Sequence, residues 1–259
     1  MRTADVVSVF TRGETGGNLL GVVDDLDGLD EQSMQTIAAE LGFSETIFLD
    51  HASDAVAVRI FTPATELPFA GHPLVGAAWT VGGTGTLRCR IGEIPFTADD
   101  DGAGVDVPLS TAVEQVPGTP IARSLGIPEP LAAWRVAMPL RYLIVDLGLA
   151  HAVLAAVPDI GALREAADVT MLLARDDAED LVVARCFAPG LGVDEDPATG
   201  SAAVAYASVA TWVGEPKGSV TIDQGDAMGH PSRIELAWRE GRCRLGGTVR
   251  REGTRDLDH

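Results

Sequence analysis

The sequence predicts an α+β fold of two similar halves, each a curved mixed sheet or barrel wrapped round a central helix. Two repeated segments indicate an internal duplication. The matched pairs are RIFTP with RCFAP (59–63 and 185–189) and PFAGH with PATGS (68–72 and 197–201). Uncharged runs of small and apolar residues follow, at 73–81 and 202–213. A helix that is apolar on every face is buried on every face, and these runs are too short to span a membrane. We therefore expect each to lie inside its own sheet.

The elements of the first half follow from local patterns. Runs rich in β-branched and aromatic residues predict strands at 6–10, 19–23, 46–50 and 55–61. Between the second and third runs, apolar residues recur at helical spacing and predict an amphipathic helix. It covers 30–42, with Asp30 suited to its N-cap and Gly42 to its C-terminal end.

The second half shows a similar order of elements. We expect strands at 142–148, 151–157, 171–174 and 181–187, with a helix over 158–167 after the second strand. The segment 116–130 is rich in proline and glycine and is interpreted as the connector. The predicted halves are 1–115 and 116–259, with a last strand over about 244–259 that pairs with the first half.

Composition excludes several classes of protein. Apolar residues make up 46% of the 259 and charged residues 22%, as in globular proteins, and the net charge is −19. Such a chain repels a phosphate backbone, so we expect no nucleic-acid partner. Three cysteines do not make a disulfide framework, and no run has the length and apolarity of a signal peptide or a membrane span. We therefore expect a cytoplasmic protein without a membrane partner.

Each central helix begins immediately after a glycine, at Gly71-His72 and at Gly200-Ser201. Helix N-termini present unpaired N–H groups and a partial positive charge, so they are natural anion sites. Two such sites from two similar halves can face one cleft. The alternative is simple capping, with Ser201 as an N-cap and His72 on a solvated turn.

Two acidic residues are candidates for proton transfer or substrate orientation. Glu45 opens a predicted strand between apolar neighbours, and such a setting raises the pKa of a carboxyl toward neutral pH. The alternative is a solvated glutamate at a strand end. Asp196 directly precedes the second central helix and could cap it or orient a substrate; Leu67 stands at the equivalent place in the first half.

Other chemistries find no support in the sequence. The histidines show no HxH or HExxH spacing, so we expect no metal site. There is no glycine-rich phosphate loop, and Gly200-Ser201-Ala202 is not a nucleophile elbow. Trp79 and Trp212, which recur near the ends of the two helices, are interpreted as core residues.

With these residues assembled, the chain resembles the phenazine-biosynthesis PhzF-like family, within the diaminopimelate-epimerase-like fold. The resemblance covers both halves in the family's order. Its segments are VFTRGETGGNLLGVV (9–23), GFSETIFL (42–49), RIFTPATELPFAGHPLVGAA (59–78), EDPATGSA (195–202) and RLGGTVRREG (244–253).

The resemblance implies a cofactor-independent and metal-independent isomerase, similar to trans-2,3-dihydro-3-hydroxyanthranilate isomerase, with its active site between the halves. It implies that Glu45 moves the proton, that His72 and Asp196 act at the substrate, and that Ser201 matches the family's serine. The backbone at Gly71 and Gly200 would bind the substrate's carboxylate. The resemblance also implies a homodimer.

Two other functions stay open at this point. One is a small-carboxylate binding protein that has the same cleft but little or no turnover. The other is a purely structural role. For the isomerase and for the binding protein, the expected partner is a small-molecule carboxylate.

Overall fold

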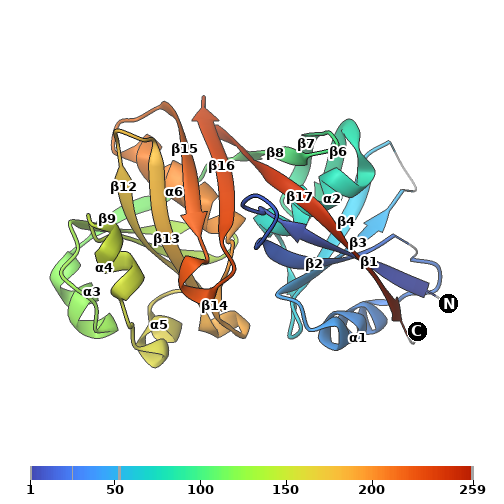
Figure 1. Cartoon of the computed structure of the whole chain (residues 1–259), viewed down its shortest axis with the longest axis horizontal. Helices are drawn as coiled ribbons and strands as arrows, with labels where there is room; N and C mark the ends of the chain where they lie inside the picture. The colour runs from blue at the N-terminus through green and yellow to red at the C-terminus, as the bar shows by residue number, and fades with distance from the viewer. Residues whose placement is uncertain (1, 25, 52–53, 258–259) are drawn as a thin grey trace.

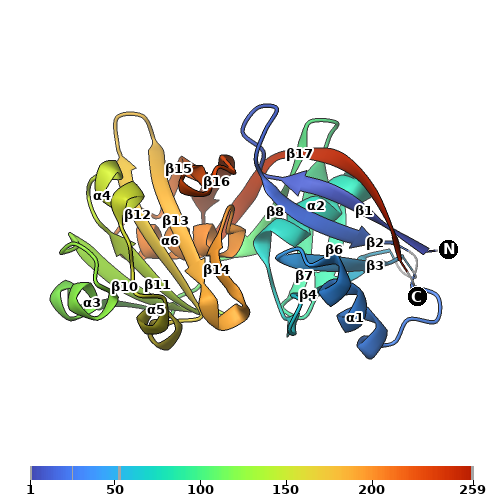
Figure 2. The ribbon, with the colours of Figure 1, turned by 60° about the horizontal axis from the view of Figure 1, so that its bottom comes forward.

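The computed structural model describes residues 2–24, 26–51 and 54–257. It shows two lobes side by side, with the last strand, β17 (Arg242–Leu257), running from one into the other (Figure 1). In both views helix α2 (Gly71–Val81) lies within the first lobe and helix α6 (Gly200–Trp212) within the second (Figure 2). The predicted α+β class, with a sheet wrapped round a helix in each half, is confirmed.

The first lobe is a ring of hydrogen-bonded strands. Strand β17 closes it by pairing with β8 along 242–248 and with β1 along 249–257. Helix α2 fills the ring, and its residues 71–78 are buried. In ring order before β17, the strands are β1 (Arg2–Val9), β2 (Asn18–Val23), β3 (Glu45–Asp50), β4 (Val56–Phe61), β6 (Gly83–Cys89), β7 (Gly92–Ala98) and β8 (Gly102–Pro108). The short β5 (Glu66–Leu67) pairs with β4.

The second lobe also wraps a sheet around a helix, α6, whose residues 200–210 are buried, but no pairing among the described residues joins its outer strands, β9 (Val113–Val116) and β17, into a ring. Strand β17 also belongs to the sheet of this lobe, because its residues 242–246 pair with β16. The other strands are β9 (Val113–Val116), β10 (Ala132–Ala137), β11 (Arg141–Asp146), β12 (Val169–Asp176), β13 (Leu181–Ala188), β14 (Val193–Asp196), β15 (Lys217–Gln224) and β16 (Ser232–Arg239). Outer helices are α3 (Gly118–Leu125), α4 (Ala150–Ala155) and α5 (Ile160–Ala166), with 3₁₀ turns η1 (Pro189–Leu191) and η2 (Asp226–Met228).

The duplication is visible in the contacts of equivalent residues. Arg59 and Glu66 form a two-pronged ion pair with N–O distances of 2.8 and 2.7 Å. Arg185 and Glu195 repeat it at 2.8 and 2.7 Å. The strand registers agree as well, since Leu67 pairs with residue 60 and Asp196 with residue 186. The extra residues of the second half accompany η1, which lies between these blocks.

The amphipathic helix is confirmed as α1 (Glu31–Leu41). The Asp30 side chain caps it by accepting a hydrogen bond from the Ser33 N–H at 2.8 Å, and Gly42 ends it in the left-handed conformation at φ 67°. The helix covers the outside of the first lobe, where Met34 and Ile37 pack into a small apolar cluster with strand residues.

Three expectations were wrong. The predicted strand at 151–157 forms α4 instead, because its alanines and leucine favour a helix and only one face packs on the sheet. The predicted connector 116–130 contains α3. Pro120 lies in the first turn of that helix, where proline is tolerated, and Gly126 ends it at φ 67°. Trp212 is 48% exposed rather than in the core.

Residues 258 and 259, part of the predicted last strand, lie outside the described residues. None of the helices in the described ranges combines the length and apolarity needed to cross a membrane.

Candidate active site

The two central helices meet at their N-termini, where the two lobes touch. A Cβ placed on Gly71 would lie 2.6 Å from the carbonyl carbon of Gly200, and one on Gly200 would lie 3.1 Å from the backbone of Gly71. Glycine is therefore required at Gly71, and a side chain at Gly200 would fit only if its neighbours shifted by a few tenths of an ångström. The predicted pair of helix N-termini is thus brought to one place.

Neither helix has a side-chain cap among the described residues. Ala70 occupies the N-cap position of α2, and Thr199 that of α6. Ser201 is the second residue of α6, so it does not cap the helix, and it lies at the position that His72 has in α2. No capping side chain therefore competes with a ligand for the N–H groups of the two first turns.

Glu45 and His72 lie together at this junction. Glu45 is the first residue of β3, and its Oε2 is 3.4 Å from Nδ1 of His72. This Oε2 has no hydrogen-bond partner within the described part of the chain. Burial raises the pKa of Glu45, and the negative charge of Asp196 raises it further, to about 8. Glu45 therefore changes its protonation near neutral pH.

His72 is a neutral imidazole in this setting. Its side chain is only 3% exposed, and burial lowers its pKa to about 3. Its Nε2 atom is buried and has no hydrogen-bond partner in the described ranges. Since buried polar atoms are normally satisfied, this nitrogen is available to a ligand or to water.

Asp196 reaches the same place from the second lobe, at the end of β14. Burial raises its pKa to about 6, although hydrogen bonds from Thr199 and Asn18 lower it. Asn18 donates to one carboxylate oxygen at 2.8 Å, and Thr199 donates to the other at 2.5 Å. At neutral pH, Asp196 is mainly ionised while Glu45 is mainly protonated.

Glu45 and Asp196 line one small cavity between the lobes, whereas His72, which lies against Glu45, is not one of its lining residues. The cavity volume of about 30 Å³ holds little more than a water molecule, far less than the roughly 300 Å³ of a typical ligand pocket. A ring-sized substrate therefore needs the walls to move apart. Lining residues from both halves are Ser44, Glu45, Thr62, Leu67, Phe69, Ala70, Leu140, Val169, Ala188, Leu191, Val193, Asp196, Thr199 and Ser201.

Sequence reasoning missed the polar residues that support this site. They are Asn18, Ser44, Thr199 and Gln224, and they connect to one another and to Asp196. The signal available was weak: Asn18 follows two glycines, and Ser44 directly precedes Glu45. Tyr142, another missed residue, is fully buried beside Ser201.

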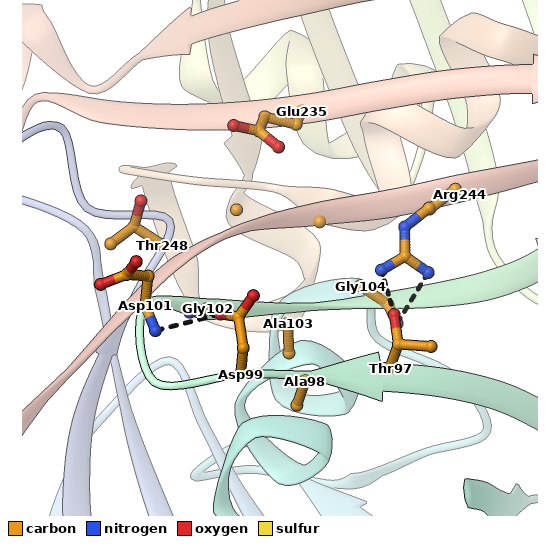
Figure 3. A pocket seen from close by; sticks show the side chains of 12 residues that line it. Thr97, Ala98, Asp99, Asp101, Gly102, Ala103, Gly104, Glu235, Arg244 and Thr248 are labelled. Carbon is orange, nitrogen blue, oxygen red and sulfur yellow. Dashed lines mark hydrogen bonds between the residues drawn. The ribbon is translucent and has the colours of Figure 1, made fainter. Parts of the chain in front are cut away.

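A larger hollow lies elsewhere, on the outer face where β8 pairs with β17 (Figure 3). Arg244 extends across it to Thr97, and the acidic side chains there, among them Asp99, face solvent. Nothing in its lining pairs a buried acid with a base, so we place no chemistry there. Within residues 2–24, 26–51 and 54–257, no group of three potential ligands is arranged to hold a metal ion.

Comparison with known proteins adds names to this geometry. A family model described as phenazine biosynthesis-like protein matches residues 7–249. The trans-2,3-dihydro-3-hydroxyanthranilate isomerase of Pseudomonas chlororaphis is 32% identical, over 92% of this chain and 90% of that protein. A predicted epimerase from Pseudomonas aeruginosa has a similar structure, with a TM-score of 0.80 at 26% identity over 100% of both chains. A probable proline racemase from Agrobacterium radiobacter, at 11% identity over 99% and 93% of the chains, shares the fold with a TM-score of 0.71.

Proposed function

The chain belongs to the phenazine biosynthesis-like family and is an isomerase, and we propose that it moves a proton within a small unsaturated carboxylate without a cofactor. The observation that carries this proposal is Glu45, a buried carboxyl with a pKa of about 8 beside a neutral histidine. A group that titrates near the working pH is suited to both removing and returning a proton.

Glu45 acts first as a general base and then as a general acid on one face of the substrate. Its ionised fraction removes an acidic C–H proton, and the protonated carboxyl then delivers that proton to another carbon of the conjugated system. No described residue hydrogen-bonds the Oε2 atom, so no such contact competes with the substrate for this oxygen. The uncharged and buried His72 holds a polar group of the substrate through Nε2.

The helix N-termini stabilise negative charge on the substrate. The first turns of α2 and α6, which begin at Gly71 and Gly200 and have no side-chain cap among the described residues, meet at the junction where Glu45 lies. Preorganised donors of this kind stabilise a carboxylate and the charge that develops as the proton leaves. Ser201 adds a hydroxyl at the cavity wall, and Asp196 orients a polar group of the substrate from the second lobe.

We propose trans-2,3-dihydro-3-hydroxyanthranilate as the first substrate to test, since a relative of this chain carries that name. We propose a cytoplasmic homodimer without nucleic-acid or membrane partners, in which each subunit has the halves 1–115 and 116–259; the net charge of −19 disfavours binding to a phosphate backbone. The second candidate is a small-carboxylate binding protein that has the same cleft but little or no turnover; in either case the walls of the cavity of about 30 Å³ must move apart to admit the ligand.

Proton NMR of the substrate incubated with the enzyme separates the two candidates. We expect conversion by the wild type and by Glu165→Gln, an exposed glutamate on α5 that serves as a matched control. Glu45→Gln should convert the substrate about 10²–10⁴-fold more slowly. Thermal stabilisation by the compound without conversion would instead support the binding protein.

A further inference from the structure

A chain of hydrogen bonds crosses from the first lobe to the second beside the two carboxyl groups. Ser44 Oγ lies 2.9 Å from Asn18 Oδ1, and Asn18 Nδ2 lies 2.8 Å from Asp196 Oδ1. Thr199 continues the chain on the other oxygen of Asp196, and Gln224 donates to Thr199 at 3.0 Å. Ser44 directly precedes Glu45, and a hydrogen bond donated by its hydroxyl to ionised Glu45 would lower the pKa of Glu45, so the chain bears on both acids of the site.

The chemistry of its partners fixes the orientation of the Asn18 amide. Besides Asp196, its Nδ2 lies 3.2 Å from the carbonyl oxygen of Ala198, and a carbonyl oxygen can only accept a hydrogen bond. The amide nitrogen must therefore face the second lobe, and the amide oxygen must face Ser44. That oxygen can only accept as well, so the single hydroxyl proton of Ser44 is donated to Asn18.

This direction determines which carboxyl is stabilised in which form. With its proton given to Asn18, Ser44 can accept a hydrogen bond from protonated Glu45 but cannot donate one to the ionised form. Asp196 receives two donated hydrogen bonds, from Asn18 and from Thr199, and these favour its ionised form. The other titratable groups that face the pair are His72, Tyr142 on β11 and Cys186 on β13.

We propose that Asn18 is a positioning residue that directs this chain so that, in the resting enzyme, Glu45 holds the proton and Asp196 holds the charge. Asn18 is 3% exposed, so water does not compete for its amide. It is also the only asparagine in the sequence. The relevance to turnover rests on the proposed function, but the placement of the proton is a property of the free protein.

The test is a ¹³C NMR titration of ligand-free protein labelled at the glutamate side-chain carboxyl carbon, with Glu45→Gln identifying the resonance of Glu45. In Asn18→Leu the Ser44 hydroxyl is free to donate to Glu45, so the titration midpoint should fall by about one pH unit, the effect of one hydrogen bond. In Ser44→Ala the protonated Glu45 loses its acceptor, and the midpoint should also fall. Ser219→Ala, an exposed serine on β15, should leave it unchanged.

The change in the Glu45 midpoint caused by Ser44→Ala has opposite signs for the two possible directions of the hydrogen bond between Ser44 and Glu45. If Ser44 donated to ionised Glu45, Ser44→Ala would raise the midpoint, and that result overturns the proposal. An unchanged midpoint in folded Asn18→Leu overturns it too, since Asn18 would then be only structural. Should Asn18→Leu fail to fold, Ser44→Ala alone decides, because it leaves the contact between Asn18 and Asp196 in place. No substrate is present, so the outcome is independent of whether the isomerase assay succeeds.

Discussion

The buried carboxyl of Glu45 makes the stability of this protein depend on pH in a way that one substitution should remove. In the folded protein the pKa of Glu45 is raised from 4.5 to about 8. The native state therefore holds this proton more tightly than the unfolded chain does. The resulting contribution to stability is fully present below about pH 4.5 and is lost as the pH rises through about 8.

The size of this effect follows from the pKa difference. At 1.36 kcal/mol per pKa unit, the change from 4.5 to about 8 corresponds to at most about 5 kcal/mol. The Glu45 side chain keeps 16% exposure, and solvent reaching it reduces this figure. We therefore expect the wild type to lose about 2–4 kcal/mol relative to Glu45→Gln between pH 5 and pH 9, because glutamine has a similar shape and stays neutral.

Urea denaturation followed by tryptophan fluorescence at pH 5, 7 and 9 measures this difference directly. Asp196 also titrates in this range, with a pKa of about 6, so only the difference between the two proteins isolates Glu45. Glu165→Gln should follow the wild type at every pH. A gap between wild type and Glu45→Gln that stays constant from pH 5 to pH 9 would refute a raised pKa at Glu45.

Three further predictions concern the junction and the duplicated ion pair. Gly71→Ala should destabilise the fold by about 3 kcal/mol or more, because its Cβ would meet the Gly200 backbone. Gly190→Ala would make only a van der Waals contact of 3.9 Å with the Arg164 side chain and should change stability little. Urea denaturation at pH 7 compares the two variants. Arg185→Met should cost about 2–4 kcal/mol, since it leaves the partly buried carboxylate of Glu195 without its cation, whereas the exposed Arg141→Met should cost less. Equal losses would contradict this difference. His72, with its pKa lowered to about 3, should show no ring titration between pH 5 and pH 8 by NMR, with the resonance assigned by its loss in His72→Gln. A midpoint inside that range would show that the imidazole is solvated.

The sequence was sufficient for the architecture because the duplication repeats residues with fixed physical tasks. Pro and Gly mark the turn before each central helix. Arg59 with Phe61 in the first half is repeated as Arg185 with Phe187 in the second, and each guanidinium carbon lies over its ring, 5.1 and 5.0 Å from the ring centre. The helix at 150–155 was not predicted because a short apolar run has no distinct period. Whether such a run forms a helix or a strand depends on its packing, here against β12 and β13.

The site was predictable only in part, for a geometric reason. Glu45 stood out because its neighbours are apolar, and His72 because it follows a glycine at the start of a central helix; the structure brings the two to 3.4 Å from each other. Asn18 acts through Ser44, 26 positions away, and through Asp196, 178 positions away. No local pattern encodes contacts of that range, so the support of the two carboxyls appears only in the folded chain.

The central claim is that Glu45 carries a proton between two carbons of a bound substrate. Proton NMR in D₂O with trans-2,3-dihydro-3-hydroxyanthranilate tests it most directly, with wild type and Glu45→Gln side by side. We predict product from the wild type, with protium at the reprotonated carbon where Glu45 returns the abstracted proton directly and deuterium where that proton first exchanges with solvent, and conversion about 10²–10⁴-fold slower with Glu45→Gln. Conversion by Glu45→Gln at the wild-type rate would contradict the account.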